Sequence, residues 1–91
     1  MEGRATISAD ILARYAADAA REVDGVQGLH GRHGVRVTDD DGRVAVELHV
    51  ALAWGASIPR VGREVQERVA GYLLQMADVE PRVDVIVDAV Q

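Results

Sequence analysis

A strand-to-helix junction at residues 54–59, WGASIP, is the first place in the chain where a ligand could bind. A glycine that follows a strand and precedes a helix can expose backbone N–H groups to an anion. Phosphate-binding loops of this type carry several glycines followed by Lys and Ser or Thr, whereas Gly55 stands alone. The pattern therefore favours a structural role, in which Gly55 turns the chain and Trp54 covers the edge of the core. Ser57 then caps the next helix, with Pro59 in its first turn.

The three histidines, His30, His33 and His49, are the next candidates, because imidazole is a common metal ligand. The first two lie on a glycine-rich connection and the third on a predicted strand, so no helix holds two of them at ligand spacing. The acidic run 39–41 resembles half of a calcium loop, but the glutamate that completes such a loop is missing. We interpret the histidines as exposed titrating groups and the aspartates as a solvated turn, and we expect no metal or other cofactor.

Nucleophilic catalysis has no candidate residues. The chain contains no cysteine, and its two serines, Ser8 and Ser57, both occupy positions typical of helix N-caps. No combination of Ser, His and Asp can therefore be assigned the roles of a catalytic triad. We predict that the protein is not an enzyme and has no catalytic residues.

Two overlapping Gly-x-x-Gly patterns at residues 28–34, GLHGRHG, match the loop of KH-type RNA-binding domains. Arg32 and Arg36 lie close enough to contact a phosphate backbone. However, the KH loop joins two helices, whereas this segment joins a helix to a strand. The net charge of −5 also repels nucleic acid. Nucleic acid is therefore not an expected partner, and a KH-like RNA-binding module using the Gly28–Gly34 loop remains the alternative hypothesis.

Length and composition indicate one small globular domain spanning residues 1–91. Only Tyr15, Trp54 and Tyr72 are aromatic, so the core must consist of Val, Leu, Ile and Ala. A domain of this size buries only about 60–65% of its unfolded surface. Association would add burial that a monomer cannot supply, and a homo-oligomer is therefore expected.

Hydrophobic periodicity predicts two helices and several strands. Ser8 and Asp10 are typical of a helix start, and an Asp-Gly pair at positions 41 and 42 is a strong hairpin signal. The expected elements are an extended entry at 6–8, a helix at 9–24, a hairpin at 35–53, a helix from 58 to about 77 and a strand at 82–90.

These elements follow a β-α-β-β-α-β order, in which two helices can cover only one face of the sheet. The predicted fold is a two-layer α+β sandwich, with two helices on one face of a three- to four-stranded mixed sheet. The even-numbered residues from Val44 to Leu52 point to the core, as do Val83, Val85, Val87 and Ala89. The other face carries Ala45, Glu47, His49, Ala51, Ala53, Asp84, Ile86, Asp88 and Val90. All of these except Val90 form the candidate interaction site. A half-apolar face of this kind fits either self-association or partner docking, or an ordinary solvated surface.

Several motifs give the chain a resemblance to a known family. Ile7 leads into a helix capped by Ser8, and Gly25-Val26 follows that helix. The later motifs are an aromatic-Gly pair at Trp54-Gly55, the series Val65-Gln66-x-x-Val69, and a final strand with Val83, Val85 and Val87. In this order and spacing they resemble the alkaline-shock, or envelope stress response, family of Gram-positive bacteria. The aromatic residue before the glycine is usually Tyr in that family, and Trp54 departs from the pattern.

The resemblance covers nearly the whole chain and implies a function. It implies a non-catalytic protein of the cell-envelope stress response that self-assembles and binds a membrane-anchored protein of the same family. It also implies that the motif residues Gly25, Val26, Trp54, Gly55, Pro59 and Gln66 are structural. The residues themselves leave open whether Gln66 contacts a neighbouring backbone or is exposed.

The sequence also bears on location. The N-terminal residues MEGRATISADIL lack the apolar core of a signal peptide. No apolar run approaches the ~20 residues that a membrane-spanning helix needs. We therefore expect a cytoplasmic protein that does not insert into the membrane directly, with any membrane location supplied by a partner.

Overall fold

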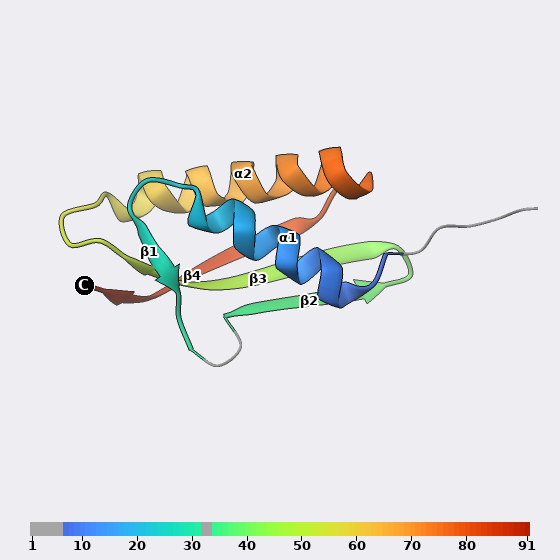
Figure 1. The fold of residues 1–91 in the computed structure, drawn as a ribbon, viewed down its shortest axis with the longest axis horizontal. Coiled ribbons are helices and arrows are strands. Elements are labelled where there is room, and N and C mark those ends of the chain that lie inside the picture. Colours follow the sequence, from blue (N-terminus) through green and yellow to red (C-terminus); the bar gives the residue numbers. More distant parts are fainter. Residues whose placement is uncertain (1–6, 32–33) are drawn as a thin grey trace, which may run out of the picture.

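The computed structural model describes residues 7–31 and 34–91, and it places both helices on one face of a single sheet (Figure 1). In chain order the elements are α1 (Ala9–Arg21), β1 (Val26–Leu29), β2 (Val35–Asp40), β3 (Arg43–Leu52), α2 (Ile58–Ala77) and β4 (Arg82–Val90). The predicted two-layer α+β class is confirmed. The predicted element order is wrong, because the described chain runs α-β-β-β-α-β.

The expected entry strand at residues 6–8 does not form where the structure describes it. Thr6 lies outside the described residues, and Ile7 and Ser8 belong to no strand. Ser8 instead acts as the N-cap of α1, and its hydroxyl accepts a hydrogen bond from the Ile11 N–H at 3.3 Å. Ile7 and Ser8 therefore lead into α1 and do not extend the sheet.

The fourth strand is β1, which lies in the segment that the sequence predicted as a glycine-rich connection. It pairs antiparallel with the end of β3, with Val26 opposite Leu52 and Leu29 opposite Val50. A register shift leaves Gln27 as an extra residue in this strand. A strand of four residues that contains a glycine and a bulge shows no alternation, which is why periodicity did not detect it.

The sheet is organised around β3. Both β1 and β2 pair with it antiparallel, and β4 pairs with it in parallel, so the sheet is mixed as predicted. At the break between β1 and β2, the His30 N–H donates to the His49 carbonyl and the His49 N–H donates to the Gly34 carbonyl, both at 2.8 Å. The two short strands therefore follow one another along the same edge of β3, and the chain leaves that edge opposite His49.

The predicted hairpin is confirmed, although β2 extends to Asp40. Asp41 and Gly42 form its turn with φ values of 54° and 84°, the left-handed conformation that a two-residue hairpin turn requires. The Asp39 carboxylate accepts a hydrogen bond from the Gly42 N–H at 3.0 Å. Across the strands, the register runs from Val35 opposite Leu48 to Asp40 opposite Arg43.

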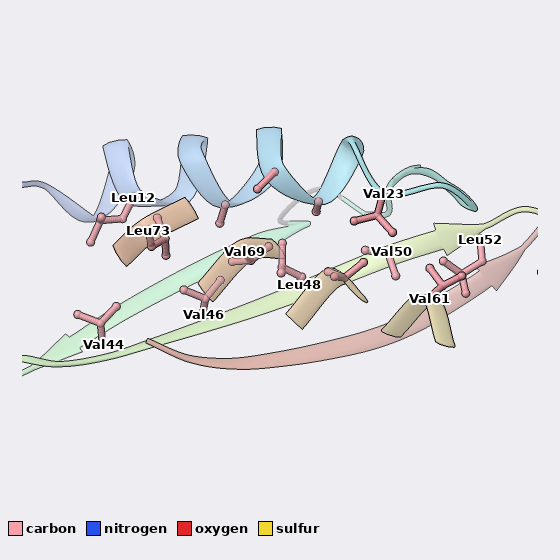
Figure 2. Packing of buried hydrophobic residues seen from close by; sticks show 14 residues of the cluster. Leu12, Val23, Val44, Val46, Leu48, Val50, Leu52, Val61, Val69 and Leu73 are labelled. Carbon is pink, nitrogen blue, oxygen red and sulfur yellow. The ribbon is translucent and has the colours of Figure 1, made fainter. Parts of the chain in front are cut away.

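The core lies between the sheet and the two helices (Figure 2). The predicted core face of β3 is confirmed, and Val46, Leu48 and Val50 are fully buried. The α2 stripe is confirmed at Val61, Val65, Val69 and Leu73. Burial does not extend to three apolar residues at helix ends, because Ile11, Ile58 and Met76 are 43%, 49% and 46% exposed. Helical periodicity assigns these residues to the buried stripes but cannot show where the opposing layer ends.

The helices also contact each other directly. The rings of Tyr15 and Tyr72 meet edge to face with centroids 5.7 Å apart, a geometry that adds to the burial of the two rings. Arg68 of α2 also reaches Glu22 at the end of α1, at 3.2 Å. Helix α1 ends at Arg21, three residues earlier than predicted, with Glu22 as its C-cap.

Gly25 closes the turn after α1 and allows a tight approach to α2. Its φ of +98° lies in the left-handed region, and an added Cβ would lie 2.9 Å from the Val61 Cγ2. Its carbonyl accepts a hydrogen bond from the Ala53 N–H at 2.7 Å. Gly25 therefore joins the end of α1, the end of β3 and the first turns of α2.

Replacing Gly25 with Ala should lower the free energy of unfolding by about 1–2 kcal/mol through the left-handed backbone alone. The contact with Val61 adds to this loss. Gly28→Ala is the matched control, because no atom lies within 4 Å of its Cβ position and the change is expected to stay within about 0.5 kcal/mol. Urea denaturation measures both variants. Equal midpoints for the two would contradict this account of Gly25.

Candidate interaction surface on the outer face of the sheet

The face of the sheet opposite the helices, called the outer face here, has no element packed on it within residues 7–31 and 34–91 (Figure 1). The strand register places its residues in rows across the sheet. One row contains Arg36, Glu47 and Asp84, and the next contains His49 and Ile86. The eight residues predicted to form the interaction site lie between core-facing residues of β3 and β4 or directly after them. The register brings the predicted residues of β3 beside those of β4.

One predicted outer-face residue is less accessible than expected. Ala51 lies in the outer-facing register opposite Gly28 and Ala89, but it is only 5% exposed. A large or charged side chain at this position would have to displace its neighbours. Ile86 is partly exposed and is therefore the better position for testing the outer face.

A bulge in β4 changes which of its last residues face outward. Val50 lies opposite Val87, but the next residue, Ala51, lies opposite Ala89, so Asp88 is an extra residue in β4. Simple alternation predicted Ala89 toward the core and Val90 outward. The register is the reverse, because Ala89 pairs with an outer-facing residue and Val90 pairs with the core-facing Leu52.

Asp88 forms part of a charged cluster around His49. The His49 Nδ1 lies 2.8 Å from the Asp88 Oδ2, and its Nε2 lies 2.8 Å from the Glu47 Oε2. His30 is also close, with its Nδ1 3.6 Å from the same Asp88 oxygen. These four side chains come from β3, from β4 and from the end of β1.

The geometry favours the charged form of His49. A carboxylate can only accept hydrogen bonds, and a neutral imidazole has one N–H, so hydrogen bonds to both carboxylates require both ring nitrogens to be protonated. The hydrogen bond to Glu47, followed by the one to Asp88, raises the pKa of His49 above its ordinary value of 6.5. The hydrogen bond from His49 in turn lowers the pKa of Asp88.

The charges around this cluster are mixed in sign. Glu47 has Arg36 opposite it in β2 and Asp84 opposite it in β4. Arg82 lies 3.5 Å from Asp84, measured from Nε to Oδ2. The arrangement presents both positive and negative groups beside small apolar ones. Over the described ranges 7–31 and 34–91, no group of three or more His, Asp or Glu side chains is arranged to hold a metal ion.

The strand-to-helix junction at residues 54–59, the first candidate site in the sequence, turns the chain into α2. Gly55 has a φ of +90°, and the Ser57 hydroxyl accepts a hydrogen bond from the Arg60 N–H at 3.4 Å, so both predicted roles are confirmed. The prediction for Trp54 is wrong, because this residue is 83% exposed and does not cover the core. Its backbone N–H donates to the Gln91 carbonyl at 2.6 Å, which holds the chain beyond the last core residue of β3.

The Gly-x-x-Gly segment differs from a KH loop. Gly28 and Leu29 belong to β1, and Gly34 directly precedes β2, so the segment joins two strands along one sheet edge. His33 and Arg32 lie outside the described residues. The pattern therefore occurs here without the two helices that a KH loop connects.

Gln66 contacts the backbone of a neighbouring strand, one of the two alternatives left open by the sequence. Its Nε2 donates a hydrogen bond to the Val83 carbonyl at 3.2 Å and thereby joins α2 to β4.

Sequence reasoning did not place His30 beside the outer face, because His30 reaches that face only through the pairing of β1 with β3. It did assign Asp88 to the face, but no sequence signal indicated the bulge that accompanies the contact with His49.

No helix in the described part of the chain has the length and apolar character needed to cross a bilayer.

The fold and the outer face together define a small α+β domain in which no described element covers one face of the sheet. Comparison with known proteins assigns its family. A model of the alkaline shock protein 23 family, described as having a cell envelope-related function, matches residues 1–91. The chain belongs to this family. Its members are not known as enzymes.

Two relatives come from Gram-positive bacteria. The chain is 28% identical over 92 residues to the uncharacterized protein YqhY of Bacillus subtilis, covering 85% of this chain and 68% of that protein. It is 29% identical over 90 residues to the uncharacterized protein Spy1535 of Streptococcus pyogenes, covering 85% and 70%. Neither name assigns a biochemical activity.

Among solved structures, the chain resembles the MamM CTD. The structure titled MamM-CTD 215-293 matches with a TM-score of 0.62 and 15% identity, over 88% of this chain and 96% of that one. A point variant of the same domain matches with a TM-score of 0.65 and 15% identity, over 90% and 98%. At this identity the likeness describes the fold alone.

The pKa of His49, followed by NMR of its ring protons, should lie above 6.5. Glu47→Gln should lower it more than Asp88→Asn, because the hydrogen bond to Glu47 is the largest cause of the shift. Since the folded-state pKa is raised, the stabilisation from His49 is complete below pH 6.5 and is lost as the pH rises through the folded-state pKa. Thermal unfolding across this range measures the loss.

The lowered pKa of Asp88 acts at acid pH with the opposite sign. Its contribution to stability is complete above pH 3.8 and is lost as the pH falls through its folded-state pKa.

For the His49 titration, Asp84→Asn is the control, because the Asp84 carboxylate contacts Arg82 and not His49. A His49 titration that Glu47→Gln leaves unmoved would contradict the described cluster.

Proposed function

We propose that this protein is a non-catalytic, cytoplasmic component of the cell-envelope stress response that acts by self-assembly and by binding a membrane-anchored protein of the same family. The family match, with its cell envelope-related function, supports the cellular setting. The observation that carries the mode of action is the outer face, which no described element covers. The same face serves for both kinds of association.

The composition of the outer face supports association. Ala45 and Ile86 are partly buried apolar residues that lie among charged ones. Protein interfaces commonly combine an apolar centre with polar groups that fix orientation. A small domain whose core contains only Val, Leu and Ala also gains burial by pairing that it cannot obtain alone.

The charges of the outer face are suited to a second copy. Arg36 and Arg82 are positive, whereas Glu47, Asp84 and Asp88 are negative. In a two-fold dimer, residues away from the symmetry axis meet different residues of the other copy, so a surface with both signs can be complementary to itself. A related domain with a similar face, attached to a membrane anchor, could dock in the same manner.

Replacing Ile86 with Arg should abolish self-association while leaving the monomer folded. Asp84 and Asp88 flank the new charge within the monomer, but burying it between two sheets is strongly unfavourable. Light scattering behind a sizing column, from low to high micromolar protein, measures the effect. The unmodified chain should form a concentration-dependent dimer or larger assembly, and the variant should remain monomeric.

Leu74→Arg is the matched control, because Leu74 is 45% exposed on α2, in the helix layer. This variant should associate as the unmodified chain does. Circular dichroism confirms that both variants fold. Normal assembly of Ile86→Arg would show that the outer face is the wrong surface, and a monomer at every concentration of the unmodified chain would exclude self-assembly.

A further inference from the structure

The start of α1, the end of α2 and the turn from β2 to β3 lie at the same end of the molecule (Figure 1). Residues of these three segments line a groove there. Its volume is about 820 Å³, within the range of ligand pockets in proteins. Its apolar lining includes the buried side chains of Leu12 and Val44, with Ala77, Val79 and the half-exposed Met76 beside them. The groove shares no residue with the outer face.

The groove also carries three carboxylates from three different places in the fold. Asp39 lies in β2, Asp41 lies in the hairpin turn and Asp78 is the C-cap of α2. Among the residues that the structure describes, none that lines the groove is basic. Within residues 7–31 and 34–91, none of the seven ion pairs involves these aspartates. The groove thus combines an apolar lining with a concentrated negative charge that its described surroundings do not neutralise.

Asp78 occupies a position where its charge is unfavourable for folding. It lies at the C-terminal end of α2, where the helix dipole favours cations, and the last turn contains no basic residue. Its backbone is left-handed, with φ 56° and ψ 40°, a conformation that Gly or Asn usually supplies at helix ends. Asn would keep the side-chain size and the backbone preference without the charge. A residue that opposes the local preferences of the fold is a candidate for a functional role.

We infer that this groove binds a segment of a partner protein in which apolar side chains alternate with arginine or lysine. The apolar side chains of such a segment would contact Met76, Ala77 and Val79. Its cations would reach the carboxylates of Asp39, Asp41 and Asp78. Charge complementarity selects this occupant, because an acidic or neutral segment would bring no cation to the three carboxylates.

The test uses the full chain and a fluorescein-labelled peptide of alternating arginine and leucine, with binding followed by fluorescence anisotropy. Two comparison peptides replace either arginine by glutamate or leucine by serine. Only the arginine-leucine peptide should bind, and binding should weaken as salt rises. The NMR signals of Met76 and Val79 should shift on its addition.

Asp78→Asn should weaken the binding of the peptide about two- to fivefold, the range expected for one exposed charge pair. The same change should raise the melting temperature by about 1–5 °C, because it removes a carboxylate from the negative end of a helix. Met76→Ser should also weaken binding through the loss of apolar contact. Asp18→Asn is the control, since this exposed residue of α1 is paired with Arg21 away from the groove.

Several outcomes would overturn the proposal. Equal binding of the glutamate-leucine peptide would show that charge does not select the ligand, and equal binding of the arginine-serine peptide would show attraction to an acidic protein only. If Asp78→Asn bound the peptide with unchanged affinity, the peptide would bind outside the groove. Release of the bound peptide as the protein concentration is raised would show that the groove serves self-association.

Discussion

Every strand pairing in the described sheet is made by β3. Its two edges hold β1 and β2 on one side and β4 on the other, and its core face contributes Val46, Leu48 and Val50, all fully buried. The helices pack on that same face. The alternation of this one strand therefore determines which residues form the core and which form the outer face. A shift of its register by one residue would exchange the two sets.

The sequence could predict the parts of the structure that depend on periodicity. Alternation from Val44 to Leu52 located the core face, and helical spacing located Val61, Val65 and Val69. Local chemistry located the caps at Ser8 and Ser57 and the turn at Asp41-Gly42, because each needs only neighbouring backbone groups. These features follow from short-range physical chemistry, which a single sequence contains.

Features that depend on contacts between distant segments were not predictable in the same way. The strand β1 is defined by pairing with β3 rather than by its own residues, and Asp88 is an extra residue only relative to β3. The exposure of Trp54 depends on where the core ends along β3. The residues of the outer face were assigned correctly in large part, but the hydrogen bonds around His49 depend on the bulge that no pattern indicated.

The break between β1 and β2 determines where the chain can change in length. Both backbone hydrogen-bonding groups of His49 are occupied by the two ends of the connection, at His30 and Gly34, so the sheet edge is closed whatever lies between them. The entropy of closing a loop grows slowly, at about 0.6 kcal/mol for each doubling of its length. Residues inserted at this point would leave the strand pairings and the core unaltered. The connection is thus a natural place for a sequence to acquire new recognition residues at the border of the outer face while keeping the same fold.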